Sequence, residues 1–272
     1  MNKYEAPENY IYYNGADKAK ILFAEEIPKE YVLVDTTKYN ISDTVTDGLS
    51  EEFWNNIQQY GERVDYSYAF CNSAYTALSP LYPIKATNAM YMFMNCSVLS
   101  DAGNILINIT SEKPNMMYVC ANCGSMTTAP IFNFINAPIV KTYTSMYASC
   151  YNVNNVKVYW GDGSEDAVTQ RNACQNMFFK CWNLKDIDFG AEETGSPTKL
   201  DLSYSEDLTM ASVQSLLSSL KTIPTGSAGT YEITLSSKTV ENLTDDILTG
   251  FSNKGWTIKQ ETRERPSVES EE

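Results

Sequence analysis

Two cysteines in the segment CANC, Cys120 and Cys123, have the spacing of a redox pair or of half a structural zinc site. A structural zinc needs two more ligands, and these would be other cysteines because the chain contains no histidine. The lack of histidine also excludes Ser-His-Asp and Cys-His catalysis. The seven cysteines are an odd number, so a closed disulfide framework is not expected.

Acidic residues offer two further kinds of chemistry. Asp186 and Asp188 alternate with Ile187 and Phe189, as on a half-buried strand, and could serve as a glycosidase pair only opposite a cleft. No cleft is indicated, so we interpret them as a solvated strand face.

The segment WGDGSED (160–166) could hold calcium, but it lacks the alternating ligands and closing glutamate of a calcium loop. We interpret it as a tight turn, and we expect no metal, no cofactor and no enzymatic activity.

Charge and hydropathy narrow the class of partner. The formal net charge of −14 opposes binding to nucleic acid and to anionic lipid surfaces. No window approaches the roughly 18 apolar residues of a membrane span. The N-terminus, MNKYEAPENYIYY, lacks the apolar core of a signal peptide, so export by the usual route is not expected.

The elements that hold these cysteines repeat along the chain. Five stretches align: YAFCNSAYT, YMFMNCSVL, YVCANCGSM, SMYASCYNV and NMFFKCWNL. Their shared anchor position is occupied by Ser73, Cys96, Cys123, Cys150 and Cys181, at intervals of 23, 27, 27 and 31 residues. Intervals of this size are typical of repeat proteins.

The apolar positions of each stretch follow the spacing of one helical face. Apolar residues stand seven, four and three positions before the anchor and three after it, which predicts a short helix. Asp65, Asn88, Asn115 and Thr142 precede this face in the first four copies, and we predict that they are N-cap residues. A short β-prone run follows the anchor at 105–109, 131–135, 156–160 and 187–189. Each repeat is therefore predicted to be a helix, a turn and a strand.

Such a short helix and strand cannot bury their apolar sides alone, so the repeats are expected to stack. The position three before the anchor then forms a second ladder: Phe70, Phe93, Cys120, Tyr147 and Phe178. Both residues of the CANC pair lie on ladder positions. We therefore interpret them as small apolar fillers between neighbouring coils rather than as a redox or zinc site.

These motifs resemble the BspA-type leucine-rich repeat family, whose units carry a Met-Phe-x-x-Cys-x-x-Leu helix and a strand. The copies that carry the resemblance are Met92-Phe93 with Cys96 and Leu99, Met146-Tyr147 with Cys150 and Val153, and Met177-Phe178 with Cys181 and Leu184. The resemblance covers about residues 65–258. It implies an α/β repeat fold, a leucine-rich-repeat-like solenoid of short helices and strands with a small N-terminal α+β module.

Four regions are expected. Residues 1–64 form a cap or attachment module, with a hairpin about Asn14-Gly15, a third strand in EYVLVDTT and a helix at 50–60. Residues 65–199 hold the repeats. Residues 200–258 form a C-terminal capping repeat, with helices capped by Thr209 and Thr244, a strand in YEITL and a helix stop at Gly255. Residues 259–272 are predicted to be a disordered acidic tail.

The family resemblance implies binding rather than catalysis. Members are adhesins and surface antigens, and similar repeats occur in structural proteins of gut phages. We expect a surface component of a phage virion, associated with the capsid or the tail. Binding to a host receptor is one role that such a component can have. The alternative is a bacterial cell-surface adhesin. The expected partners are a protein or glycan surface of a host cell, or other virion proteins, and a homo-oligomer is compatible with the sequence. Candidate contact residues are Tyr82, Tyr91, Tyr159 and Trp160.

Overall fold

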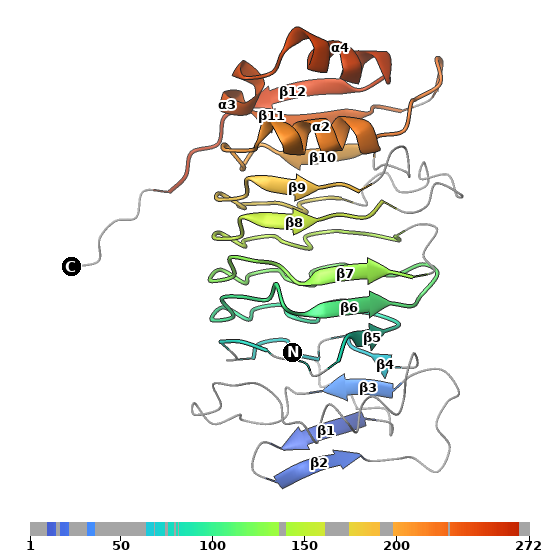
Figure 1. Ribbon diagram of the computed structural model, residues 1–272, viewed down its shortest axis with the longest axis vertical. Coiled ribbons are helices and arrows are strands. Elements are labelled where there is room, and N and C mark those ends of the chain that lie inside the picture. Colours follow the sequence, from blue (N-terminus) through green and yellow to red (C-terminus); the bar gives the residue numbers. More distant parts are fainter. Residues whose placement is uncertain are drawn as a thin grey trace, which may run out of the picture.

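A computed structural model of the protein describes residues 10–14, 17–21, 32–35, 64–67, 69–73, 76–78, 80, 82–135, 140–160, 174–190, 198–227 and 229–266. Elements follow one another along one axis, from β1 and β2 at one end to α4 at the other (Figure 1). Parallel strands that lie about one repeat apart in the sequence pair with each other, so the chain forms a stack of coils.

The N-terminal end is a four-stranded sheet with the order β2-β1-β3-β4. The predicted hairpin is present, because β1 (Tyr10–Asn14) pairs antiparallel with β2 (Asp17–Ile21). The predicted third strand is β3 (Val32–Asp35), which runs parallel to β1, and β4 (Val64–Asp65) adds to its far side. The helix predicted at 50–60 lies outside the described residues.

One long side of the stack is formed by the short strands of the repeats. Strands β5 (Ile84–Ala86), β6 (Leu106–Ile109) and β7 (Ile131–Phe134) make one parallel sheet, and β8 (Asn155–Lys157) and β9 (Asp186–Asp188) make another. Strands β6 to β9 fall on runs that the sequence predicts, whereas β5 was not predicted. In each of these strands the inward residues reach the core, as Ile107 and Ile109 do in β6.

The prediction of a helix in each repeat is wrong, because the described residues of 65–199 contain no helix. The five stretches form consecutive turns instead. In the second stretch, Met92 N–H donates to the Ala89 carbonyl and Cys96 N–H to the Phe93 carbonyl, at 3.0 and 3.1 Å. The amides that alternate with these local bonds donate to the next coil: Tyr91 to Met117, Phe93 to Val119 and Asn95 to Ala121. Alternate amides thus close local turns and bind the neighbouring coil, which leaves none for a helical ladder.

The residue before each anchor has a left-handed backbone, with φ between 59° and 63°. In the turn 93–96 this residue, Asn95, is third, and a positive φ at the third position alone is the signature of a type II turn. Asparagine tolerates this conformation better than most residues. Asn72, Asn95 and Asn122 occupy the position in successive coils, and their side-chain amides hydrogen-bond to one another at 2.8 Å.

Three of the four predicted N-cap residues accept a backbone N–H of the following turn, but within the described residues no helix begins at any of them. Asn88, Asn115 and Thr142 each accept the N–H two residues ahead through the side-chain oxygen, at 3.2, 3.0 and 3.0 Å. Because no described helix follows, each of these bonds closes a turn made by the side chain itself, and the N-cap prediction is wrong for the three residues. The leucine-rich-repeat-like solenoid class stays a prediction, and its helical element does not apply to the described repeats.

At the C-terminal end, α-helices replace the turn segments beside the parallel strands. Strands β10 (Lys199–Leu202), β11 (Glu232–Ser236) and β12 (Thr257–Glu261) form a parallel sheet. Helices α2 (Met210–Ser219) and α4 (Asp245–Asn253) lie beside it, with the short α3 (Ser237–Glu241) after β11 (Figure 1). The predicted caps are confirmed: Thr209 and Thr244 accept the N–H groups of Ser212 and Ile247, and Gly255 has φ +81° after the last helix.

Helix α2 takes the place of the next strand beside β9. Its Ser212 and Ser215 hydroxyls accept the N–H groups of Ile187 and Phe189, at 2.9 and 3.0 Å. These hydroxyls satisfy backbone donors that an exposed strand edge would leave open. Ser212 is buried for this reason.

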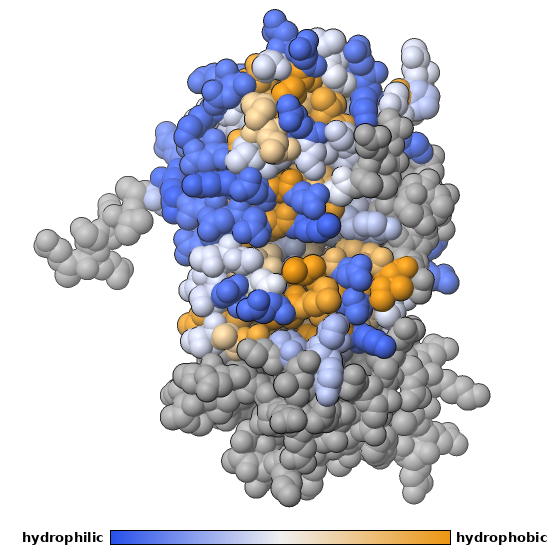
Figure 2. All heavy atoms as spheres, in the orientation of Figure 1, coloured by the Kyte–Doolittle hydropathy of each residue, from blue (hydrophilic) through white to orange (hydrophobic). Residues whose placement is uncertain are grey.

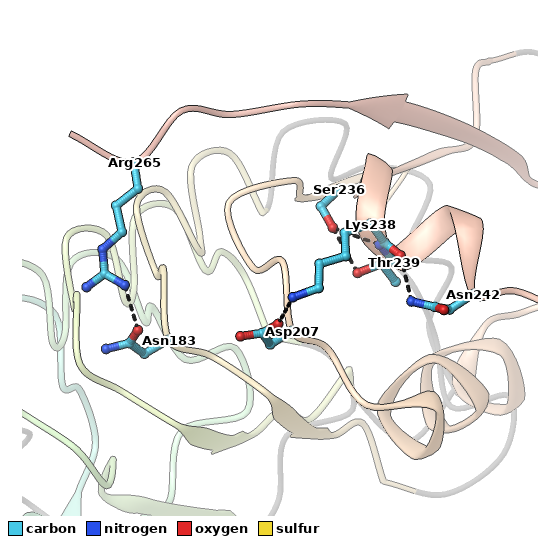
Figure 3. Close-up of polar contacts among 7 residues, drawn as sticks. All are labelled: Asn183, Asp207, Ser236, Lys238, Thr239, Asn242 and Arg265. Atoms are coloured by element: carbon cyan, nitrogen blue, oxygen red, sulfur yellow. Dashed lines mark hydrogen bonds and ion pairs between the residues drawn. The ribbon is translucent and has the colours of Figure 1, made fainter. Parts of the chain in front are cut away.

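The prediction that the tail is disordered from residue 259 is wrong for residues 259–266. Strand β12 extends to Glu261, and Lys259 Nζ lies 2.7 Å from Glu232 Oε2. Beyond it, Arg263 Nε donates to Ser203 Oγ at 3.1 Å, and Arg265 Nη1 donates to Asn183 Oδ1 at 3.0 Å (Figure 3). Residues 263–265 are therefore held against the side of the stack.

Candidate contact surface

The four aromatic residues proposed as contact sites lie in different environments. Tyr82 is exposed, with 42% of its surface accessible. Tyr91 stacks on Tyr118, and Tyr159 stacks on Phe134, each with ring centroids 5.0 Å apart. The first pair lies in the turn segments and the second beside the strands, so the structure does not bring the tyrosines into one cluster.

Trp160 is not a surface residue, and its proposal as a contact site is wrong. Only 6% of it is accessible, it stacks on Phe189 at 5.5 Å, and its indole N–H donates to the Ser219 hydroxyl at 3.2 Å. The tryptophan joins strand β8's coil to helix α2. Its role is packing.

The largest exposed aliphatic side chains of the strand side are on β7 and just after it. Ile131 and Ile135 are 46% and 48% accessible, and they alternate with Phe132, which is buried. Leu106 of β6 pairs in register with Ile131 and is half-buried. Figure 2 shows apolar side chains gathered over β6 and β7 on this face. We define Leu106, Ile131 and Ile135 as the β6–β7 surface.

A polar pair crosses the same face. Asn108 and Asn133 are register partners in β6 and β7, and the Asn133 amide donates to Asn108 Oδ1 at 3.1 Å. Each amide keeps further donors and acceptors for a ligand. Apolar side chains with a few oriented polar groups are the usual composition of a protein contact site.

One sequence pattern indicates the β6–β7 surface, although we did not use it to predict contact residues. The run IFNFI (131–135) was identified as a strand, and alternation in a strand sends Ile131 and Ile135 to the side opposite Phe132. A strand with apolar residues on both faces is either buried on both or exposes an apolar face. Here one face meets solvent.

The acid pair of β9 is engaged within the fold. Asp186 accepts the Thr209 hydroxyl at 2.8 Å. Asp188 accepts the Gly190 N–H at 2.8 Å and lies 3.2 Å from Lys157 Nζ. The bond from Gly190 and the nearby Lys157 ammonium lower the pKa of Asp188. A glycosidase acid needs a raised pKa, so the environment of Asp188 does not support its use as the acid.

The anchor cysteines form a ladder in which each thiol donates to the preceding coil. Sγ–H groups of Cys96, Cys123, Cys150 and Cys181 bond to the carbonyls of Phe70, Phe93, Cys120 and Tyr147, at 2.9, 3.0, 2.9 and 3.0 Å. Ser73 begins the ladder, 3.2 Å from Cys96 Sγ. The cysteines are therefore hydrogen-bond donors as well as apolar fillers, which the sequence interpretation missed.

The CANC pair lies inside this core. Cys120 and Cys123 are free thiols with no accessible surface. Burial raises the pKa of Cys120, and a hydrogen bond with Cys150 followed by burial raises that of Cys123. Redox cysteines need a lowered pKa and access to solvent, so the environment favours packing. Among the residues the structure places, no three Cys, Asp or Glu side chains group as a metal site would require. The segment 161–166, which we interpreted as part of a tight turn rather than a calcium loop, lies outside those residues.

Within the described part of the chain, no helix has the length and apolar character needed to cross a membrane. Comparisons of the chain with protein-family models, with curated proteins and with solved structures gave no match.

Proposed function

We propose that the chain is a non-enzymatic binding protein that contacts a protein partner through the β6–β7 surface. The observation that carries the proposal is the exposure of Ile131 and Ile135 on a parallel sheet whose backbone is fixed by its neighbours. Rigid strands position side chains with little entropy left to lose on binding. The exposed groups are aliphatic, which favours a protein partner over a glycan, because sugars stack on aromatic ring faces.

For the biological setting, we propose a phage virion surface component, with a bacterial cell-surface adhesin as the alternative. The resemblance of the Met-Phe-x-x-Cys-x-x-Leu stretches to repeats of phage structural proteins and surface antigens supports both settings. The net charge of −14 favours a partner other than nucleic acid in either.

The β6–β7 surface is tested with paired variants. Ile131→Glu/Ile135→Glu places two charges on the surface, and Val98→Glu/Tyr151→Glu does the same to side chains that are 42% accessible in the turn segments. Labelled wild-type chain and both variants are titrated onto the virions or the bacterial cells that carry the protein. Because burying the exposed part of each isoleucine is worth about 1 kcal/mol, the first variant should bind at least about tenfold more weakly and the second like wild type. Equal loss in both variants would contradict the assignment of this surface.

The setting is tested by immunogold electron microscopy with an antibody to the chain. Gold on assembled virions supports the first setting, and gold on intact cell envelopes supports the second. Label confined to the interior of cells would exclude both.

A further inference from the structure

The end of the stack opposite the N-terminal sheet has an unpaired strand edge. Strand β12 is the last strand in the order β10-β11-β12, and none of its five residues is buried, whereas four of five are buried in β11. Thr257 N–H donates to Tyr231, so residues 257, 259 and 261 bond toward β11. The N–H and C=O groups of Ile258 and Gln260 therefore face outward, where no described strand pairs with them.

The helix layer at the same end exposes an apolar side chain. A Cβ added to Gly250 of α4 would lie 2.7 Å from Leu217 Cδ2, so Gly250 faces α2 and the rest of the stack. Leu248 is two residues away, about 200° around the helix, and so faces away from the stack. It is 37% accessible. This end of the stack therefore exposes a strand edge of the sheet layer, on β12, and a leucine of the helix layer, Leu248.

We propose that a second copy of the chain docks on this end through β12, with the two β12 strands antiparallel about a two-fold axis at Gln260. An outward-facing residue is the position at which two identical antiparallel strands exchange both backbone hydrogen bonds. The sheet then continues from one copy into the other. Helix α2 contacts α4, with Leu217 against Gly250, so the two helices belong to one layer, and the two-fold axis would bring the α4 helices of the two copies together at Leu248.

Charge complementarity selects this register. With Gln260 opposite itself, Lys259 stands opposite Glu261 of the second copy, and Glu261 opposite its Lys259. Opposite charges across an antiparallel pair stabilise it, whereas a register centred on Lys259 would oppose like charges. Lys259 also lies 2.7 Å from Glu232 Oε2, so the lysine would sit between two carboxylates.

The chain after β12 leaves the edge open. Arg263 stacks over the Tyr204 ring at 4.9 Å, and Arg265 reaches Asn183 (Figure 3). Both contacts turn residues 263–265 toward the preceding coils and away from β12's outer side. This docking surface is separate from the β6–β7 surface and does not depend on the function proposed for it.

The first test is sedimentation equilibrium of the full chain at about 0.15 M salt, which screens the −14 charge of each copy. Wild type should approach twice 30.5 kDa as concentration rises to about 100 µM. Gln260→Pro removes an outward N–H and spares the bonds to β11, and it should weaken association about tenfold or more. Gln260→Ala keeps that N–H and should associate within about twofold of wild type. A wild-type monomer throughout the range, or equal association of all three, would overturn the proposal.

The second test reports on the register without a proline. Gln260→Cys places two thiols at a pair position with Cβ atoms about 5 Å apart, within the span of a short bis-maleimide cross-linker, which should link the copies. Gln214→Cys, exposed on α2, is the control and should not link. Background is low because the seven native cysteines are buried. If the Gln214→Cys variant links as readily as the Gln260→Cys variant, the two copies do not meet at β12.

Discussion

Two tyrosines four residues apart should respond in opposite directions to loss of the hydroxyl. Tyr143 and Tyr147 are both buried in the core. The Tyr143 hydroxyl donates to the Tyr159 carbonyl, whereas the Tyr147 hydroxyl has no hydrogen-bond partner. Phenylalanine already occupies the position of Tyr147 in the next coil, where Phe178 stacks on Tyr147 with ring centroids 5.8 Å apart. The backbone and packing therefore accept a ring without a hydroxyl there.

The size of the effect follows from the cost of burying an unpaired polar group. Tyr147→Phe removes that cost and should raise the free energy of unfolding by about 1 kcal/mol. Tyr143→Phe loses a buried hydrogen bond and should lower it by about 1 kcal/mol. For a chain of this size the two variants should melt a few degrees above and below wild type, at about 2–4 °C per kcal/mol.

Urea unfolding followed by tryptophan fluorescence measures both changes. The midpoints should move in opposite directions at an unchanged slope, which shows that stability rather than compactness has changed. The double variant tests whether the neighbouring rings couple. If Tyr147→Phe destabilises the chain as much as Tyr143→Phe does, the Tyr147 hydroxyl has a partner and the reasoning from its burial is wrong.

Other expected results concern the thiol ladder and helix α2. Cys150→Ala should cost about 2 kcal/mol in urea unfolding, because it removes the bond to the Cys120 carbonyl and leaves a small void, whereas Cys150→Ser keeps a donor and should cost less. The native thiols should react with Ellman's reagent at least about a hundredfold more slowly than in guanidinium, and equal rates would show that the ladder opens readily. Burial raises the pKa of Cys120 and Cys150 above their ordinary 9.0, so the folded chain keeps protons that the unfolded chain releases. Stability should therefore be full below about pH 9 and fall as the pH rises above it, because only the unfolded chain releases these protons, and thermal melts across this range would show the fall. Ser212→Ala should cost about 1–2 kcal/mol by leaving the Ile187 N–H unpaired, while exposed Ser218→Ala should cost almost nothing in the same melts.

The sequence predicted which residues are buried better than it predicted their conformation. Ala89, Met92, Phe93, Cys96 and Leu99 are all buried, as the spacing requires. Two consecutive type II turns, however, bury the same positions as a short helix, so the apolar pattern alone does not distinguish them. The distinguishing residue is the one before the anchor, which is asparagine in three of the five copies. Asparagine is unfavourable inside a helix and favourable with positive φ, and this preference indicates turns.

Helices α2 and α4 were predicted correctly because their signals are local. Thr209 and Thr244 bond to amides three residues ahead, and a cap of this kind needs no information from another coil. The turn segments depend on carbonyls supplied by the next coil, about 26 residues away, as in the bond from Phe93 to Val119. A pattern read within one segment does not contain that contact. For the same reason the candidate surface, which combines β6 with β7, was not found from single segments.

The two sides of the stack tolerate change differently, and this difference bears on function. The thiol-to-carbonyl bonds keep lengths of 2.9–3.0 Å although the intervals between anchors vary from 23 to 31 residues. The turn side therefore holds the coils in register whatever lies between the anchors. The strand side varies along the same stack: β5 to β7 form one sheet, β8 and β9 another, and α2 takes the next place. A fixed side that holds the coils leaves the other side free to change its exposed residues, which supports placing the contact surface on β6 and β7 rather than on the turns.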